Sequence, residues 1–222
     1  MKIGLVDSHN NSYDYLAKIS RKNRINYCEK HRYDFIEFSF EELPDKRSPH
    51  WGRVLALKKH LKEYDWMLYL DTDSIICNTN LKIEDMTDQY YDLIVGPDPQ
   101  KSEGHLSTSG MLFKNTEWSM HFLNEWFEQK QFIDKPYIPK LEHANLSTGN
   151  DGGGKYYEQS AFHYMYDTME NHRKKIKIVP RKVFNSLIHT WEAGDFLIHF
   201  PGPDKLLKKW GMIHYSNMRK IM

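Results

Sequence analysis

The strongest constraint on the fold is a run of five apolar residues, Trp-Met-Leu-Tyr-Leu at 66–70, that leads directly into Asp71 and Asp73. Such a run is typical of a buried strand. A charge in a low-dielectric interior is unfavourable unless something pairs with it. The two carboxylates therefore either end the strand in water or meet a cation there. Residues i and i+2 of a strand point to the same side, so both can face one site.

Predicted strands and helices alternate along the chain. Strands are expected at 3–6, 33–40, 66–73, 92–98, 107–115, 175–180 and 195–200, and helices at 12–32, 52–63, 116–129 and 157–171. Ser12 is the expected N-cap of the first helix. The alternation predicts an α/β fold whose sheet is covered on both faces. Ligands of such sheets bind beyond the carboxyl ends of strands, which is where Asp71 and Asp73 lie.

Composition narrows the function classes. The 222 residues suffice for one sizeable domain, and 31 basic against 30 acidic residues give no general nucleic-acid or membrane footprint. A local basic patch remains open near the end of the sequence, at Lys205, Lys208, Lys209, Arg219 and Lys220. Two cysteines, Cys28 and Cys77, are too few for a disulfide scaffold. No signal peptide or membrane-length run is visible, so we expect a soluble, cytoplasmic protein.

The pattern Asp-x-Asp alone is a weak motif, and its position gives it weight. Two carboxylates suit a hard cation, Mg²⁺ or Mn²⁺, which commonly keeps phosphate oxygens in its shell and so points to a diphosphate substrate. His199 could add a nitrogen ligand, which would favour Mn²⁺. The lysines near residue 205 could offset phosphate charge. The alternative interpretation is a solvated strand end for the two aspartates, a structural role for the histidine and a solvated helix face for the lysines.

Two enzyme classes fit a strand that ends in Asp-x-Asp. A haloacid-dehalogenase-type phosphatase would have Thr or Val where this chain has Ile75, and a later acidic pair where Asp195 stands alone. That class is disfavoured. The second class is a nucleotide-sugar glycosyltransferase of the GT-A type, in which Asp-x-Asp holds the metal on the donor diphosphate. A binding module without activity is the non-enzyme alternative.

Five sequence blocks, in order, resemble glycosyltransferase family 34, which includes fungal α-galactosyl- and α-mannosyltransferases and plant xyloglucan α-xylosyltransferases. The blocks are 23–38, 50–76, 107–127, 156–162 and 194–202. The resemblance implies a single GT-A, Rossmann-like domain over 1–222, with a mixed, mostly parallel sheet and helices on both faces. Its donor-binding part would be about 1–115 and its acceptor and catalytic part about 116–222.

The same resemblance implies a metal-dependent glycosyltransferase. It would move a hexose or pentose from a nucleotide sugar, a UDP-sugar, to a hydroxyl of a glycan or glycoconjugate, with retention and with Mn²⁺ or Mg²⁺. An inverting GT-A enzyme with another donor sugar is the alternative. The acceptor and the oligomeric state are not indicated, and no membrane span or nucleic-acid partner is expected.

The resemblance also assigns site residues. Asp71, Asp73 and His199 would be the metal ligands. Gln159 would lie near the anomeric carbon of the donor sugar, with Glu158 beside it. The donor-binding candidates are Asp7, Trp51, Arg53, Asp71 and Lys205, the last one residue further from His199 than the family spacing.

Two departures from the family concern the sugar and the membrane. The family asparagine expected near the sugar is Ser107 or Thr108 here, which leaves the donor open. No membrane anchor or stem of the family kind is recognisable in the 222 residues.

The glycine-rich segment 143–155 is expected to be mobile and to close over a bound donor, or else to be a simple connector.

Overall fold

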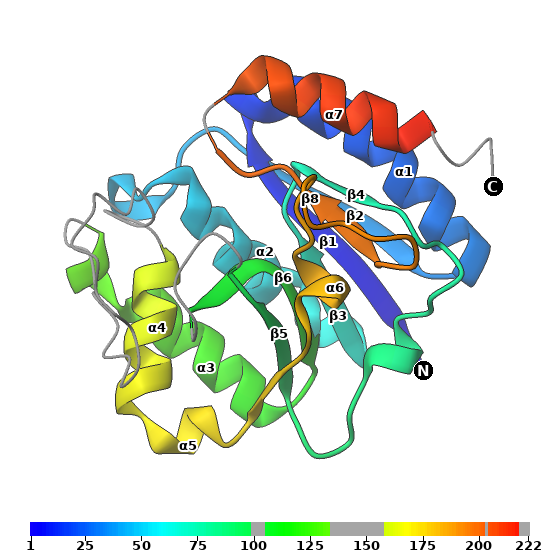
Figure 1. The fold of residues 1–222 in the computed structure, drawn as a ribbon. Helices are drawn as coiled ribbons and strands as arrows, with labels where there is room; N and C mark the ends of the chain where they lie inside the picture. The colour runs from blue at the N-terminus through cyan, green and yellow to red at the C-terminus, as the bar shows by residue number, and fades with distance from the viewer. Residues whose placement is uncertain (99–104, 134–157, 203, 218–222) are drawn as a thin grey trace.

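The protein is built around a central six-stranded sheet with a two-stranded sheet beside it (Figure 1). A computed structural model describes residues 1–98, 105–133, 158–202 and 204–217, and the strands and helices below are those of this part of the chain. The large sheet contains β1 (Ile3–Asn10), β2 (Asp34–Phe40), β3 (Trp66–Leu70), β5 (Leu93–Pro97), β6 (Leu106–Lys114) and β7 (Ile176–Ile178). The small sheet pairs β4 (Ser74–Ile76) with β8 (Leu197–His199).

The strand order of the large sheet is β2-β1-β3-β6-β5-β7. β1 is parallel to β2 and β3, and β5 is parallel to β7, whereas β6 runs antiparallel to β3 and β5. All five residues of β3 are buried, as a continuous apolar run at the middle of a covered sheet requires. The predicted mixed, mostly parallel sheet is thus confirmed.

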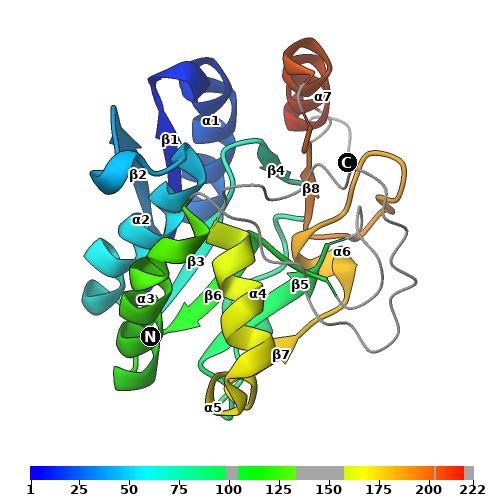
Figure 2. The same ribbon diagram turned by 90° about the vertical axis from the view of Figure 1, so that its left-hand side faces the viewer.

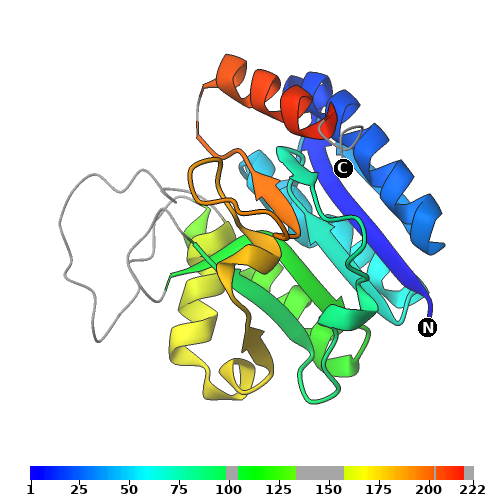
Figure 3. The same cartoon turned by 45° about the vertical axis from the view of Figure 1, so that its right-hand side comes forward.

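Helices cover both faces of this sheet. The helices are α1 (Asp14–His31), α2 (Gly52–His60), α3 (Glu117–Glu128), α4 (Glu158–Thr168), α5 (Glu170–Arg173), α6 (Arg181–Phe184) and α7 (Lys205–Asn217). Figure 2 shows α2, α3 and α4 together on one face. Figures 1 and 3 show α1 on the opposite face, with α7 lying along it.

The hydrophobic core is likewise divided between the two faces of the large sheet. Alternate residues of β1 and β3 enter two apolar clusters: Val6 and Tyr69 pack towards α2, while Leu5 and Leu68 pack against the α1 side with Tyr27. A third cluster joins α1 to α7 through β4 and β8, and Met212 contributes to it from α7. This third cluster holds the small sheet beyond the end of β3.

Most predicted elements are present, and their ends differ in physically understandable ways. The first helix begins at Asp14, and the expected cap by Ser12 is wrong. Residues 11–13 form a separate 3₁₀ turn, where the Ser12 hydroxyl donates to Asn10 Oδ1 at 2.7 Å instead of capping. The helix predicted at 52–63 is α-helical to His60 and then tightens into a 3₁₀ turn.

Three further expectations concern a helix, a loop and membrane-spanning segments. The helix predicted at 157–171 is two helices, α4 and α5, separated at Met169. The segment 143–155, for which a lid is predicted, lies outside the described residues. Within the described part of the chain, every helix is too short or too polar to cross a membrane.

Candidate functional site

The two aspartates lie on a tight turn at the carboxyl end of β3. The Asp71 amide donates to Ser109 O of β6 at 2.8 Å, and the Ser74 amide donates to Asp71 O at 3.1 Å. The chain then enters β4, which pairs antiparallel with β8 so that Ser74 lies opposite His199. The register of this small sheet therefore carries His199 to the aspartates, which are more than a hundred residues earlier in the sequence.

Asp71, Asp73 and His199 form a cluster whose ligand atoms all lie within 4.8 Å of one another. His199 Nε2 is 3.4 Å from Asp73 Oδ1 and 3.8 Å from Asp71 Oδ2. Asp73 and His199 are buried, and 17% of the Asp71 side chain is exposed. Two carboxylates and one imidazole, reached from one side by solvent, are a donor set that suits a hard divalent cation.

The orientation of the His199 ring is set by Asn185, which follows α6. Asn185 Nδ2 donates to Pro97 O at 3.1 Å, so its oxygen faces the ring, and His199 Nδ1 lies 2.8 Å from that oxygen. Nδ1 therefore carries a hydrogen, and Nε2 is the nitrogen that faces the carboxylates, where its lone pair would serve a cation once its own proton is lost. Metal-binding histidines are commonly held in this way, so the residues fit a cation.

A lysine of α7 completes the charge of the cluster. Lys208 Nζ is 2.5 Å from Asp73 Oδ2, and Lys208 is buried. The sequence-predicted Lys205 is exposed and is not brought into the cluster. Lys208 lies nearly one turn further along α7, on the face that also buries Met212, whereas Lys205 is at the solvent-facing start of the helix.

These contacts shift the ionisation of the cluster. Burial alone would raise the pKa of Asp73, but hydrogen bonds and charges from His199 and Lys208 outweigh it and hold the pKa below its usual value. Burial would lower the pKa of His199, but Asp73 and Asp71 raise it overall. Burial raises the pKa of Asp71, although Arg53 partly opposes this. The site is thus tuned to hold positive charge.

A second polar group adjoins the first through Arg53 of α2. One arm of Arg53 is 3.0 Å from Asp71 Oδ1 and the other is 2.9 Å from Glu158 Oε1. Thr108 of β6 links the group: its hydroxyl accepts from Arg53 at 2.5 Å and lies 2.7 Å from Glu158 Oε1 and 3.2 Å from Gln159 Oε1. The start of α4 is thereby tied to the end of β3.

Glu158 and Gln159 differ in exposure although they are adjacent. Glu158 is 1% exposed, and burial raises its pKa despite the nearby Arg53. Gln159 is half-buried, accepts from the Thr108 amide at 3.3 Å and donates to Asp98 Oδ2 at 3.3 Å. Gln159 can thus present an amide to a ligand, while Glu158 is held inside the protein by its partners.

The donor-binding candidates Asp7 and Trp51 lie in the interior of the protein. Asp7 is fully buried against Arg24 of α1, and a second arm of Arg24 donates to the Asp71 carbonyl. Burial raises the pKa of Asp7, with Arg24 opposing it. Trp51 is fully buried in the core against Phe127. Both residues support the turn and the core, and neither is brought to the surface of the cluster.

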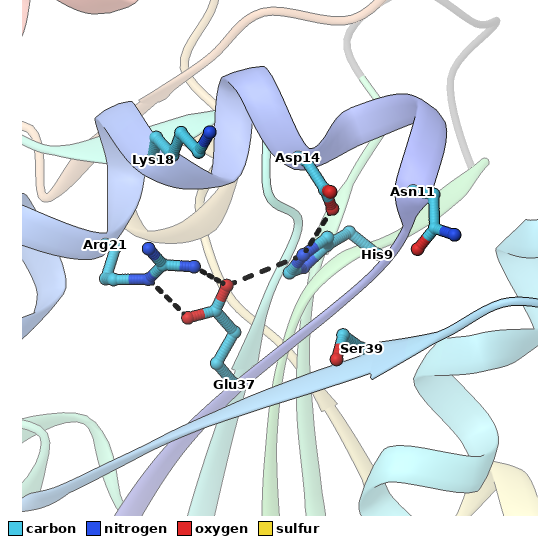
Figure 4. Close-up of a pocket in the computed structure, with 7 residues that line it drawn as sticks. All are labelled: His9, Asn11, Asp14, Lys18, Arg21, Glu37 and Ser39. Carbon is cyan, nitrogen blue, oxygen red and sulfur yellow. Dashed lines mark hydrogen bonds and ion pairs between the residues drawn. The ribbon is translucent and has the colours of Figure 1, made fainter.

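Two cavities lie near the ends of the strands. One of about 280 Å³ opens beside His199 and Lys208, and its other lining residues are Leu187, Ile188, His189, Phe200, Pro201, Gly202, Asp204 and Leu207. The other, of about 360 Å³, is polar and lies between β1, α1 and β2 (Figure 4). There Arg21 makes two hydrogen bonds of 2.5 Å to Glu37, so its charges are paired and tie α1 to β2.

Sequence reasoning missed Arg24, Thr108 and Asn185 as parts of the site. Thr108 was noticed only as a departure from the family asparagine. Arg24 sits in a helix where an arginine ordinarily faces solvent, and Asn185 follows a four-residue helix without a periodic pattern. A charged residue on the helix face that carries Leu16 and Tyr27 was the available signal, and it applied to Arg24.

The sequence matches the profile of the galactosyl transferase GMA12/MNN10 family over residues 3–93 and 96–206. A probable xyloglucan 6-xylosyltransferase 3 of Arabidopsis thaliana is 26% identical over 120 residues, which cover 50% of this chain and 26% of that protein. An alpha-1,2-galactosyltransferase of Schizosaccharomyces pombe is 23% identical over 235 residues, covering 84% of this chain and 58% of that protein. The chain thus matches only part of the length of these relatives.

Solved structures share the fold at low sequence identity. A glycosyltransferase involved in the glycosylation of the major capsid of PBCV-1 superimposes with a TM-score of 0.67 at 14% identity, covering 96% of this chain and 98% of that one. A Drosophila β-1,4-galactosyltransferase 7 mutant, in complex with manganese, UDP-Gal and xylobiose, has a TM-score of 0.50 at 10% identity, covering 90% and 71%. Both comparisons support the fold.

Proposed function

The chain belongs to the galactosyl transferase GMA12/MNN10 family, and from that premise we propose that it is a metal-dependent glycosyltransferase. It transfers a hexose or pentose from a nucleoside diphosphate sugar, a UDP-sugar, to a hydroxyl of a glycan or glycoconjugate. The observation that carries the proposal is the cluster of Asp71, Asp73 and His199 with its oriented imidazole. The manganese and UDP-Gal of the Drosophila complex support the same cofactor and donor class.

Asp71, Asp73 and His199 would hold Mn²⁺ or Mg²⁺, and the histidine favours Mn²⁺. When bound, the cation would neutralise charge that grows on the leaving nucleoside diphosphate. Lys208 is our candidate for a second positive charge towards the diphosphate, in place of Lys205, because its ammonium is already at Asp73. In this proposal the ammonium moves from the carboxylate to a phosphate oxygen when the donor binds.

Gln159 is the proposed contact to the donor sugar, since its amide is half-buried and adjoins the cluster through Thr108. Glu158 acts indirectly, because its buried carboxylate fixes Arg53, which in turn holds Asp71. Asp7 and Trp51 are assigned supporting roles beneath the donor site.

We retain the division into a donor part at about 1–115 and an acceptor part at about 116–222. The cavity beside His199, lined wholly from residues 187–208, is our candidate for the acceptor approach.

Retention of anomeric configuration is proposed from the family resemblance. The acceptor oxygen then bonds to the anomeric carbon on the face from which the phosphate oxygen leaves, and the acceptor proton passes to that phosphate. Gln159 would stabilise the positive charge that develops on the sugar ring. An inverting enzyme with another donor sugar, or a binding module without activity, is the alternative.

A screen of nucleotide sugars for donor hydrolysis and transfer, with Mn²⁺ and with EDTA, tests the proposal. We expect turnover of one donor only with the metal, and loss of turnover in Asp71→Asn. The matched control is Asp34→Asn, which removes an exposed carboxylate at the start of β2. Proton NMR of the product then reports the anomer. Turnover that persists in EDTA, or in Asp71→Asn, would contradict the metal-dependent mechanism, and an inverted anomer would contradict retention alone.

A further inference from the structure

The outer face of α7 exposes large apolar side chains to solvent. Leu206 is 69% exposed, Leu207 61% and Trp210 67%. Leu206 and Trp210 are four residues apart, so they lie one above the other on the same helix face. The half-buried Ile213 continues this face by three more residues. We call these four side chains the outer apolar face.

The inner face of the same helix also carries apolar residues, and these are already packed against the rest of the protein. Met212 is fully buried in the cluster that joins α7 to α1, and Gly211 lies so close to Phe200 that a Cβ there would be 2.6 Å from its ring. A helix that is apolar on both sides is normally covered on both sides. The outer apolar face is therefore not explained by packing within the described part of this chain.

The charges on α7 indicate what covers this face. Residues 205–217 contain three lysines and no acidic residue. Lys205 and Lys209 are exposed and lie along one side of the outer apolar face, next to Ile213, while the charge of Lys208 is paired with Asp73. Leucine and tryptophan bordered by lysine are the composition of helices that lie in the interface of a bilayer, where tryptophan is enriched and lysine meets anionic headgroups.

We infer that α7 docks the protein on an anionic lipid surface through Leu206, Leu207, Trp210 and Ile213. The helix lies parallel to the bilayer, its apolar side chains enter the boundary between headgroups and acyl chains, and Lys205 and Lys209 contact the headgroups. This is reversible surface binding, which requires no membrane-spanning helix. It does not depend on the proposed transferase activity.

A second copy of the chain fits this face less well. Four side chains of one helix fall far short of the roughly 20 residues a side that a stable protein interface needs. A two-fold contact through one helix would also bring the lysines of both copies together, and like charges repel. A bilayer has neither limitation, because it adapts to a narrow apolar stripe and carries the opposite charge.

Docking through α7 would also set the position of the site. The same helix carries Lys208 to Asp73 from its inner face, and the adjoining cavity is lined by Leu207 and His199. The cavity would then open close to the membrane surface. If the proposed function holds, this geometry favours acceptors displayed on lipids or membrane proteins.

Vesicle binding of the whole chain tests the inference. The probes are vesicles of phosphatidylcholine alone and vesicles that also contain phosphatidylserine, in co-sedimentation at low and high salt. We expect binding to the anionic vesicles that weakens with salt. The variant Leu206→Ser/Trp210→Ser should bind on the order of tenfold or more weakly, since it removes most of the apolar area. Lys209→Glu should weaken binding to anionic vesicles only.

Tyr90→Ser is the matched control, because Tyr90 is a large side chain with 75% exposure elsewhere on the surface. Its vesicle binding should equal that of the parent chain. Thermal unfolding of every variant checks that the fold is kept. The difference in fluorescence between the parent and Trp210→Phe isolates Trp210, whose emission should shift to shorter wavelength on anionic vesicles.

Results of two kinds, in vesicle binding and in self-association, would overturn the inference. One is unchanged vesicle binding by a folded Leu206→Ser/Trp210→Ser variant, or no binding by the parent chain. The other is concentration-dependent dimerisation in sedimentation velocity that this variant abolishes, because it would assign the outer apolar face to a second copy. Donor turnover is measured separately, so failure of lipid docking and failure of the transferase proposal are distinguishable.

Discussion

At the scale of single residues, Asn185 fixes which nitrogen of His199 faces the carboxylates. We expect Asn185→Ala to lower Mn²⁺ affinity about 10- to 100-fold, the usual effect of removing a partner of a metal-binding histidine. The physical reason is that the ring loses the acceptor at 2.8 Å that holds hydrogen on Nδ1. Isothermal titration calorimetry with Mn²⁺ measures the change without any turnover.

The control for this prediction is Asn185→Asp, which keeps an oxygen acceptor towards the ring while losing the donor to Pro97. It should recover part of the Mn²⁺ affinity. Because Asn185 is only 2% exposed, thermal unfolding without metal must accompany both variants. Equal Mn²⁺ affinity of the parent and a folded Asn185→Ala variant would show that the ring needs no such support.

Lys208 and Asp73 form the other residue-scale test. Replacing Asp73 by Asn leaves a buried ammonium without its partner, and we expect a loss of about 3 kcal/mol in the free energy of unfolding. The double variant Asp73→Asn/Lys208→Met removes that unpaired charge and should recover most of the stability. Neither variant should bind Mn²⁺. Chemical denaturation and calorimetry separate the two effects, and Mn²⁺ binding by the double variant would remove Asp73 from the ligand set.

At the scale of elements, α6 lies close on the large sheet because β6 has a glycine beneath it. A Cβ at Gly110 would lie 2.8 Å from Phe184 Cβ, whereas at Gly96 of β5 it would lie 3.5 Å from the same atom. We expect Gly110→Ala to lower the free energy of unfolding by about 1–3 kcal/mol and to weaken Mn²⁺ binding, since α6 leads directly into Asn185. Gly96→Ala is the control and should change each by much less. Denaturant unfolding measures the stability of both variants, and calorimetry measures their Mn²⁺ binding.

Helix α4 provides a prediction of pH dependence. His163 is 3% exposed, and burial lowers its pKa from 6.5 to about 4. Between those values the unfolded chain binds a proton that the folded protein does not. The contribution of His163 to stability is therefore full above pH 6.5 and falls as the pH drops to about 4, by up to about 3 kcal/mol.

His163→Gln removes this titration while keeping a polar side chain near Leu106. Its unfolding free energy should depend less steeply on pH between 6.5 and 4 than that of the parent chain. Urea unfolding at several pH values measures the two slopes. Parallel pH profiles would show that His163 keeps an ordinary pKa in the fold.

The sequence predicted the elements better than their contacts. The apolar run of β3 and the alternation of strands and helices were sufficient for the sheet, because both signals are local. The meeting of His199 with Asp71 depends on the β4–β8 register, which was not predicted. His199 was considered as a possible ligand from the sequence, and the family resemblance grouped it with the two aspartates. Lys205 was chosen over Lys208 by spacing along the chain, whereas the inner face of α7 is set by packing.

At the scale of the whole molecule, the candidate site joins early and late parts of the chain. Asp71 and Asp73 follow β3, while His199 ends β8. A ligand that binds all three stabilises the folded state as a whole. At a hundredfold excess over its dissociation constant, Mn²⁺ should contribute about 2.7 kcal/mol and raise the melting temperature by roughly 5–10 °C. Differential scanning calorimetry measures the shift.

The control for this shift is Asp34→Asn, which should respond to Mn²⁺ as the parent chain does. The double variant Asp73→Asn/Lys208→Met should show no shift. A shift of equal size in that variant would mean that Mn²⁺ acts elsewhere on the molecule.

The ion pair between Lys208 and Asp73 has a consequence for how the protein is handled in the cell and in the laboratory. Lysine supplies a built-in counter-ion, so folding does not have to wait for a scarce metal. Under the proposed metal dependence, a newly made chain would fold in a metal-poor compartment and bind its metal later, and a chelator should inactivate it without unfolding it. If the proposed metal dependence holds, the protein could be stored without metal and reactivated by adding it, with the ammonium kept near Asp73 until the donor binds.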